Sequence, residues 1–242
     1  MRSIRLYCSQ LPETPQEIDL PAAAHRHAIQ VLRLGVGDYL RVFNGHGLEY
    51  EAELIQADKR HSRVKLCQPI HVENESSLRL TLLQGISRGE RMDYALQKAV
   101  ELGVHRIIPM ITARCNVSLS AERRQKRQQH WQGVIISACE QSGRAWVPQL
   151  ENVMLLADFL DTQSVSCALV LDPLAEQRLT QCEPAKDVTV LIGPEGGLTR
   201  EEIEQAQRAG FTAIHLGPRI LRTETATVAT LAALQVLWGD AG

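Results

Sequence analysis

From Leu78 onward, short apolar runs alternate with segments of helical spacing, and this rhythm restricts the fold more than any other feature. The apolar runs are "LRLTLLQGI", "HRIIPMI", "CALVLDP", "VTVLIGP" and "TAIHLGP". Helical spacing separates several of them, as in "RMDYALQKAVELGV", which Gly103 can end, and in "AERRQKRQQHWQGVIISACEQS". Strands that alternate with helices favour an α/β domain with a mainly parallel sheet.

The first 72 residues follow another pattern, in which turns punctuate short strands. The strands expected are "SIRLYC", two runs within "DYLRVFNGHGLEYEAELIQA", and "HSRVKLCQPI". Asn44-Gly45 between the two alternating runs indicates a hairpin, and "AAAHRHAIQVLRL" has the spacing of one helix that Gly35 can end. We expect a small β-barrel with one helix over residues 1–72, a polar linker over 73–77 and a second domain over 78–242.

Charge is spread unevenly along the 242 residues. The chain is 44% hydrophobic with a net charge of -2, which excludes a wholly basic nucleic-acid binder. However, residues 76–135 hold ten Lys and Arg against four Asp and Glu, whereas residues 136–242 hold seven against fourteen. This asymmetry is compatible with a polyanion that lies against the middle of the chain only.

Neither targeting nor metal-binding patterns stand out. The N-terminal "MRSIRLYCSQ" is too short and too charged for a signal peptide, and no run approaches the roughly 18 apolar residues of a membrane span. The six cysteines form no C-x-x-C pair, and no His, Asp or Glu group has metal-ligand spacing. We expect a cytoplasmic protein with idle or buried thiols, no metal and no membrane partner.

One stretch, "TVLIGPEGGLTREEIEQA", runs from a strand through a glycine-rich loop into a helix. Its spacing fits neither the dinucleotide motif nor the P-loop, both of which aim free backbone N–H groups at phosphate. Here Pro194 lacks an N–H, and the Glu195 carboxylate would repel a phosphate. The loop suits a ligand without phosphate, one that is cationic or that presents an adenine edge or ribose hydroxyls. The alternative is a plain connection between strand and helix.

A second loop with Gly-Pro follows in "TAIHLGPRILRTETA". Thr199 and Glu202 indicate the start of a helix between the two loops, so the two strands should be parallel and both loops should leave the same edge of the sheet. The earlier exit "LVLDPLAE" is similar. We expect the three exits to line one pocket, with backbone groups and apolar walls from Leu191, Ile192, Leu216, Ile220 and Leu221.

These paired loops closely resemble the SPOUT class of S-adenosylmethionine-dependent RNA methyltransferases. More narrowly, the chain resembles the bacterial 16S ribosomal RNA uridine N3-methyltransferases that modify the uridine at position 1498. The narrower resemblance rests on "SRGERMDYALQKAVELGV", "ITARC", "ACEQSGRAWVP", "HAIQVLRLGVGD" and "FNGHG". It spans nearly the whole chain, although residues 153–184 add little to it.

The resemblance implies several properties that the residue patterns do not show. The C-terminal domain should contain a deep trefoil knot that holds S-adenosylmethionine in a bent form, and the N-terminal domain should be PUA-like and assist RNA binding. The enzyme should be a homodimer whose pocket lies near the subunit interface. Its partner should be 16S ribosomal RNA within the small ribosomal subunit.

The resemblance also assigns roles to residues. Glu195 and Arg222 are the catalytic candidates, because a carboxylate could face the sulfonium or the base and a guanidinium could stabilise a uracil anion. Their alternatives are a helix-dipole partner for Glu195 and a structural pair with Glu224 for Arg222. The residues expected to bind the cofactor are Leu171, Ile192, Gly193, Pro194, Glu195, Gly196, Leu216, Gly217, Ile220, Leu221, Arg222 and Thr223.

The expected RNA contacts are basic residues within the matching stretches: Arg5, His27, Arg33, Arg88, Arg91, Arg114 and Arg144. Charges on a helix are usually a solvated face, and histidines are more often surface or core residues than ligands, so these are hypotheses. Two other functions remain open, a non-catalytic RNA-binding or assembly protein and a methyltransferase for another target such as a ribose 2'-hydroxyl or a guanine in transfer RNA.

Overall fold

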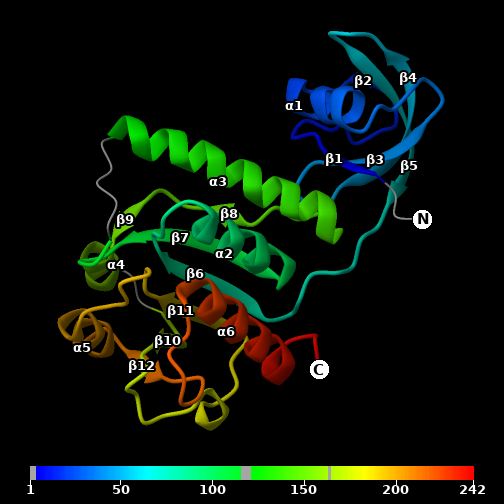
Figure 1. Ribbon diagram of the computed structural model, residues 1–242. Coiled ribbons are helices and arrows are strands. Elements are labelled where there is room, and N and C mark those ends of the chain that lie inside the picture. Colours follow the sequence, from blue (N-terminus) through cyan, green and yellow to red (C-terminus); the bar gives the residue numbers. More distant parts are fainter. Residues whose placement is uncertain (1–3, 116–120, 163–164) are drawn as a thin grey trace. The chain divides into compact units, whose positions relative to one another are not determined.

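The computed structural model describes residues 4–115, 121–162 and 165–242. The chain forms two compact units (Figure 1). The first comprises Met1–Glu75 together with Ile136–Val147, and the second comprises Ser76–Ile135 and Pro148–Gly242.

The first unit is built on a five-stranded mixed sheet. Its elements are β1 (Arg5–Tyr7), β2 (Glu17–Asp19), α1 (Ala22–His25), the π-helical η1 (Arg26–Val31), β3 (Tyr39–Phe43), β4 (Glu49–Ala57) and β5 (Ser62–Ile70). The strand order is β1-β3-β4-β5-β2, and among these pairs only β1 and β3 are parallel. The antiparallel pair β3 and β4 confirms the hairpin expected at Asn44-Gly45.

The helix of this unit is shorter and wider than its sequence predicts. Only α1 is α-helical; η1 then widens, with the Leu32 N–H bonded to the His27 carbonyl at 2.9 Å. Arg33 follows with φ of 57°, a left-handed conformation that is uncommon for a non-glycine residue. The helix therefore ends before Gly35, at a residue with no sequence signal for a stop.

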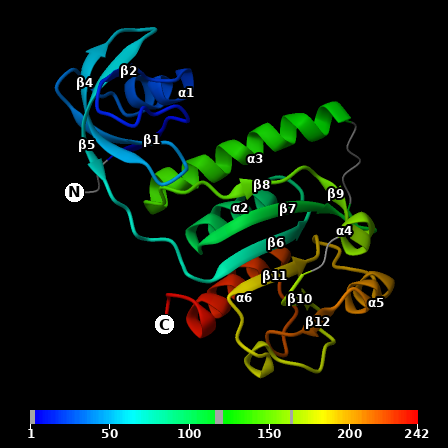
Figure 2. The same cartoon turned by 180° about the vertical axis from the view of Figure 1, so that it is seen from behind.

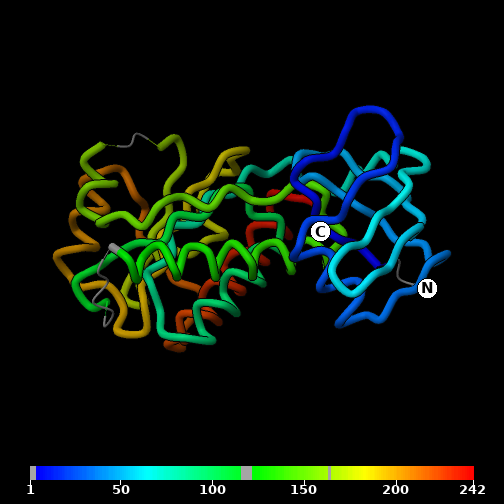
Figure 3. The backbone as a smooth tube through the Cα atoms, turned by 90° about the horizontal axis from the view of Figure 1, so that it is seen from above, coloured from blue at the N-terminus to red at the C-terminus, as the bar shows by residue number. Residues whose placement is uncertain are grey.

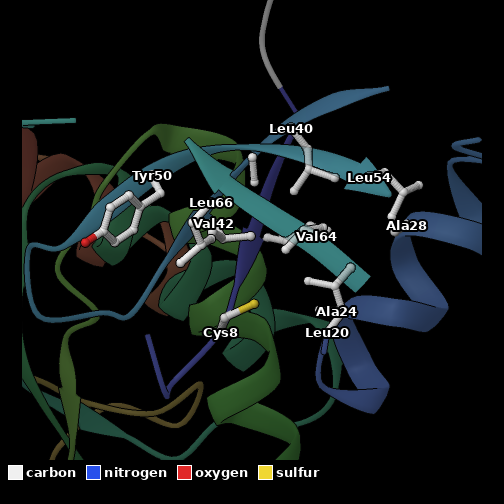
Figure 4. Close-up of a cluster of buried hydrophobic side chains, with 12 residues drawn as sticks. Cys8, Leu20, Ala24, Ala28, Leu40, Val42, Tyr50, Leu54, Val64 and Leu66 are labelled. Atoms are coloured by element: carbon white, nitrogen blue, oxygen red, sulfur yellow. The ribbon is translucent and has the colours of Figure 1, made fainter. Parts of the chain in front are cut away.

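Apolar side chains from the sheet and from α1 and η1 form one core in the first unit. Figure 4 shows Leu54 beside Ala28 and Val42 beside Leu66, with Val64 between these two pairs, and all five side chains are at most 2% exposed. The alternation of buried and exposed residues along β4 is the pattern of a strand with one face on a core.

Two of the matching stretches contact each other in this unit. The N–H of Gly47 donates to Ala145 at 3.1 Å, and the N–H of Val147 donates to Gly45 at 3.0 Å. Gly47 has φ of 91°, and a Cβ there would lie 2.8 Å from the Trp146 ring. The stretches "FNGHG" and "GRAWVP" therefore pack against each other.

The second unit has a parallel sheet. Its strands are β6 (Arg79–Gly85), β7 (Val104–Ile111), β8 (Gln149–Leu150), β9 (Met154–Leu155), β10 (Ala168–Leu171), β11 (Asp187–Ile192) and β12 (Phe211–Ile214). The order is β12-β10-β11-β6-β7-β8, with β9 also paired to β7. The pairs between these strands are all parallel, which confirms the expected α/β architecture (Figure 2).

Helices cover this sheet on both faces. They are α2 (Glu90–Glu101), α3 (Ala121–Ser142), α4 (Leu156–Thr162), the short η2 (Leu179–Gln181), α5 (Arg200–Arg208) and α6 (Thr223–Trp238). One cluster packs Leu83 and Leu191 of the sheet against Phe159 of α4 and Ile203 of α5. On the other face α2 packs on β7 and α6 on β11, and the two helices contact each other. Figure 3 traces α3 as one unbroken coil whose last residues, from Ile136, belong to the first unit.

Candidate active site

Three loops leave the carboxyl edge of the second unit's sheet and line one pocket. β10 is parallel to both β11 and β12 and lies between them, so the segments that follow these strands emerge side by side. Residues 171–174, 192–198, 215–217 and 219–221 line a pocket of about 550 Å³. This volume is in the range of sites that hold a small organic ligand.

The pocket lining is mostly apolar side chains and loop backbone. Ile192, Leu198 and Ala226 are buried at its base, whereas Leu174 and Ile220 are 83% and 86% exposed at its edge. Exposed apolar side chains beside a concave site mark a surface suited to a ligand or to another chain.

The start of α6 fixes the first Gly-Pro loop from one side. The Thr223 hydroxyl donates to the carbonyl of Gly193 at 2.6 Å and accepts from the Gln84 amide at 3.1 Å. Gly85 allows β6 to approach the same loop, since a Cβ there would lie 2.4 Å from the nitrogen of Pro194. The first Gly-Pro loop and the start of α6 are thereby joined to the end of β6.

The segment after β7 holds the same loop from another side. The Glu202 carboxylate accepts the N–H of Ala113 at 2.7 Å and the N–H of Thr199 at 2.8 Å. The Arg114 guanidinium donates to the carbonyls of Gly196 at 3.0 Å and Leu198 at 3.4 Å. Thr199 and Glu202 form the capping box that the sequence predicts, and Glu202 also binds the "ITARC" stretch.

Glu195 connects the loop to the segment before α2. Its carboxylate accepts the N–H of Arg88 at 2.7 Å and lies 3.5 Å from the Arg91 guanidinium. Partial burial opposes ionisation, but the Arg88 N–H and the Arg91 charge outweigh it and hold the pKa of Glu195 below its usual value. Glu195 is therefore an ionised group with partners in the chain.

All the residues expected to bind the cofactor line this pocket except Arg222. Leu191, which was expected as an apolar wall, does not line it and is instead fully buried in the core of the second unit. Arg222 is the N-cap residue of α6, with an exposed side chain. Within the described residues no ion pair joins it to Glu224 or to another acid.

The pocket also contains side chains that the sequence predictions missed: Asp172, Arg200, His215 and Arg219. Asp172 is 3% exposed, accepts the N–H of Leu174 at 2.9 Å and lies 3.7 Å from Arg200. The sequence could have indicated Asp172 as a site residue, because in "LVLDPLAE" it comes directly after a buried strand. The His215 ring accepts the N–H of Gly217 at 3.1 Å, which braces the second Gly-Pro loop.

Two of the expected RNA contacts need correction. Arg5 is 8% exposed, pairs with buried Glu49 at 2.6 Å and donates to the carbonyls of Cys139 at 2.6 Å and Arg144 at 3.1 Å. The guanidinium of Arg144 is also buried and forms a bidentate pair with Glu75. These two arginines stabilise the interior of the first unit and are not available to RNA.

The other expected RNA contacts have exposed or partly exposed side chains. His27 lies 3.5 Å from Glu140, while Arg33 follows η1 on the surface of the first unit. Arg88 and Arg91 are exposed at the start of α2, beside Glu195. Arg114 is exposed as well, but its guanidinium holds the loop carbonyls described above.

Two further properties concern only the residues that the structure describes. In these residues no helix is long and apolar enough to cross a membrane. Nor do three or more of their His, Cys, Asp and Glu side chains gather where a metal ion could be held.

Comparisons with known proteins match both units of the chain. Residues 74–235 match the model of an RNA methyltransferase domain, and residues 20–67 match that of an RNA methyltransferase PUA domain. This chain belongs to the RNA methyltransferase family that these domains define, and its fold is the PUA-like and SPOUT combination.

The similar proteins span the full chain. Ribosomal RNA small subunit methyltransferase E of Buchnera aphidicola is 33% identical, over 98% of this chain and 97% of its own. The structure of the enzyme of that name from Neisseria gonorrhoeae, bound to S-adenosyl methionine, is 40% identical, with a TM-score of 0.91 over 99% of both chains. A Legionella pneumophila structure with bound cofactor SAM is 38% identical, with a TM-score of 0.96 over 99% of this chain and 100% of that one.

Proposed function

We propose that this protein transfers a methyl group from S-adenosylmethionine to N3 of uridine 1498 in 16S ribosomal RNA. The observation that carries the proposal is the pocket formed by three parallel strand exits, in a chain that resembles small-subunit methyltransferases over its whole length. A catalytic role also explains why two Gly-Pro loops are held by so many contacts.

The pocket fits S-adenosylmethionine in size and in chemistry. Its volume of about 550 Å³ is adequate for a ligand of this kind, and apolar walls with exposed loop backbone suit an adenine ring and ribose. The residues that would hold it are Leu171, Ile192, Gly193, Pro194, Glu195, Gly196, Leu216, Gly217, Ile220, Leu221 and Thr223.

The bound cofactor supplies an activated methyl group. The protein then has to orient the uracil in line with that group and favour loss of the N3 proton. We assign the second task to Arg222. Its guanidinium stays charged, is exposed next to the pocket, and stands at the N-terminus of α6, where the helix dipole is also positive. These features favour a uracil anion.

We assign Glu195 a positioning role rather than that of a base. Its pKa is below the usual value, so it is a weak proton acceptor, and its carboxylate is already engaged by Arg88 and Arg91. An ionised carboxylate in this place holds the cofactor loop against the segment that precedes α2.

We also propose that the enzyme is a homodimer, knotted and cytoplasmic. Exposed apolar residues beside the pocket and along α6, namely Leu174, Ile220, Val236 and Leu237, support a second subunit there. The knot is proposed from the resemblance of the two Gly-Pro loops to the SPOUT class, and the Thr223 hydroxyl joins the start of α6 to the first of these loops by donating to the Gly193 carbonyl.

We further propose a division of labour between the parts of the chain. Residues 1–72 would assist RNA binding, residues 73–77 would link the two domains, and residues 78–242 would carry out methyl transfer, apart from residues 136–147, which belong to the first compact unit. His27 and Arg33 on the first part and Arg88, Arg91 and Arg114 on the second are the proposed RNA contacts, with small-subunit RNA as the partner. Because Arg114 already binds two carbonyls, its contact with RNA would be through its remaining donors.

Calorimetry with S-adenosylmethionine separates this function from that of a non-catalytic RNA-binding protein. We expect saturable binding, and we expect Gly196→Val to weaken it, because a side chain there would meet Arg114 Cβ 3.0 Å away and fill the loop. A folded, dimeric protein that does not bind the cofactor would support the non-catalytic alternative instead.

A further inference from the structure

The first half of α3 is a strongly basic surface of the second unit that methyl transfer does not use. Residues 121–130 contain four cations, Arg123, Arg124, Lys126 and Arg127, against one carboxylate, Glu122, in a chain whose net charge is -2. The side chains of residues 122–126 are exposed. Lys126 pairs with Glu122 at 3.0 Å, but an exposed pair of this kind contributes little and can exchange partners.

Contacts on two sides hold α3 in place. His130 Nε2 lies 2.8 Å from the Asp93 carboxylate of α2, and the Gln128 amide donates to the carbonyl of Glu151 at 2.8 Å. The side chains of Trp131 and Ile135 are buried, with 3% and 0% of their surface exposed, and anchor the helix. These contacts anchor the turns of α3 that directly follow the cations.

A groove of about 390 Å³ runs beside these cations. It is lined by Arg124, Gln125, Gln128, Gln129, Asn152 and Val153. Amide groups both donate and accept hydrogen bonds, so together with a guanidinium they match ribose hydroxyls, base edges and phosphate. No carboxylate is among these lining residues, and none of them lines the pocket between the Gly-Pro loops.

We propose that the first half of α3 and this groove form a docking surface for a single-stranded segment of the RNA substrate. Phosphates lie against Arg123 and Arg127, and one nucleotide enters the amide-lined groove. A protein partner is disfavoured, because the centre of a protein interface is typically enriched in aromatic side chains, whereas the residues that line this groove include one apolar side chain, Val153, and no aromatic one. The inference rests on the proposed function, which makes RNA the substrate, and adds a second place of contact outside the methyl-transfer pocket.

The first experiment compares two charge-matched variants. R123Q/R127Q removes two cations from α3, whereas K186Q/R208Q removes two exposed cations elsewhere in the second unit. Affinity for a single-stranded oligonucleotide with the target uridine and its flanking 16S sequence is measured over a range of salt. Since each lost phosphate contact lowers the salt slope by about 0.7 for a single strand, R123Q/R127Q should reduce the slope by about 1.4, and K186Q/R208Q should leave it unchanged.

The second experiment tests the groove. Q125A/Q129A removes neutral groups, so RNA affinity should fall without a change in salt slope. S-adenosylmethionine affinity serves as the control for folding and should equal that of the wild type in all these variants. A duplex of the same sequence should bind more weakly than the single strand.

The inference would be overturned by wild-type RNA affinity and salt slope in R123Q/R127Q, or by an equal loss in K186Q/R208Q, which would indicate a general charge effect. Equal affinity for the duplex would contradict the single-stranded occupant. Failure of the proposed function looks different: wild-type protein would bind RNA through α3 but transfer no methyl group to it.

Discussion

At the scale of single residues, Arg222 is expected to act on the transition state more than on binding. Losing one preorganised donor typically costs about a hundredfold to a thousandfold in rate, so Arg222→Ala should lose about this much in single-turnover methylation with both ligands saturating. Arg222→Lys keeps the charge but not the planar fork, and should recover only part of the loss.

A pH series separates two roles for Arg222. Raising the pH deprotonates more uracil and should partly rescue the alanine variant, if the guanidinium stabilises the anion. A slow variant with no response to pH would leave Arg222 a positioning role only. Wild-type rates in Arg222→Ala would remove it from catalysis.

Arg5 should matter for stability and not for RNA directly. Arg5→Met leaves the Glu49 carboxylate buried at 0% exposure without its main partner, which should cost about 3 to 5 kcal/mol in the free energy of unfolding. Arg33→Ala, at an exposed residue, should leave stability nearly unchanged. Denaturant unfolding measures both; an Arg5→Met protein of wild-type stability would contradict the structural role.

Residues such as Arg5 mark the limit of what the sequence could predict. Their stretches were correctly picked as part of the family pattern, but a pattern does not say whether a guanidinium faces solvent or a buried glutamate. That depends on contacts such as Arg5 with Cys139, between residues far apart in the chain. The Gly-Pro loops were predictable because glycine, proline and the capping box act locally.

At the scale of elements, the loop between β11 and α5 should depend on the two side chains that hold its carbonyls, Thr223 and Arg114. Arg114→Ala removes bonds to the carbonyls of Gly196 and Leu198. A hydrogen bond with a charged partner contributes roughly 1.5 to 3 kcal/mol, so S-adenosylmethionine should bind at least about tenfold more weakly. Arg114→Lys should restore part of this.

The matched control is Arg208→Ala, which removes an exposed cation from the last turn of α5. Its cofactor affinity should equal that of the wild type. Calorimetry measures all three variants, and an Arg114→Ala protein with wild-type affinity would show that the loop holds its shape without the guanidinium.

Elements were predictable where their periodicity was clear. Strands β6, β7, β10, β11 and β12 were expected from their apolar runs, whereas α6 was not expected, since apolar residues lie all round it and leave no polar face to define a period. The π-helical η1 was also missed, because its residues carry no preference that distinguishes the wider turn from an α-helix.

At the scale of the whole molecule, the proposed homodimer should depend on the outward face of α6. The wild type should sediment as twice 27.0 kDa. Val236→Glu and Leu237→Glu would place charges on residues that are 56% and 45% exposed, and should give monomers with weakened cofactor binding. Val36→Glu, at a residue 67% exposed in the first unit, is the control. A wild-type monomer with full cofactor affinity would contradict the proposal.

The most direct test of the central claim is the site of methyl transfer. Purified protein is incubated with methyl-labelled S-adenosylmethionine and with small subunits, or their isolated RNA, from cells that lack this protein. Mass spectrometry of the digested RNA should find one new methyl group on N3 of uridine 1498. Methylation of a ribose 2'-hydroxyl or of a guanine, or no transfer by a protein that binds both ligands, would contradict the account.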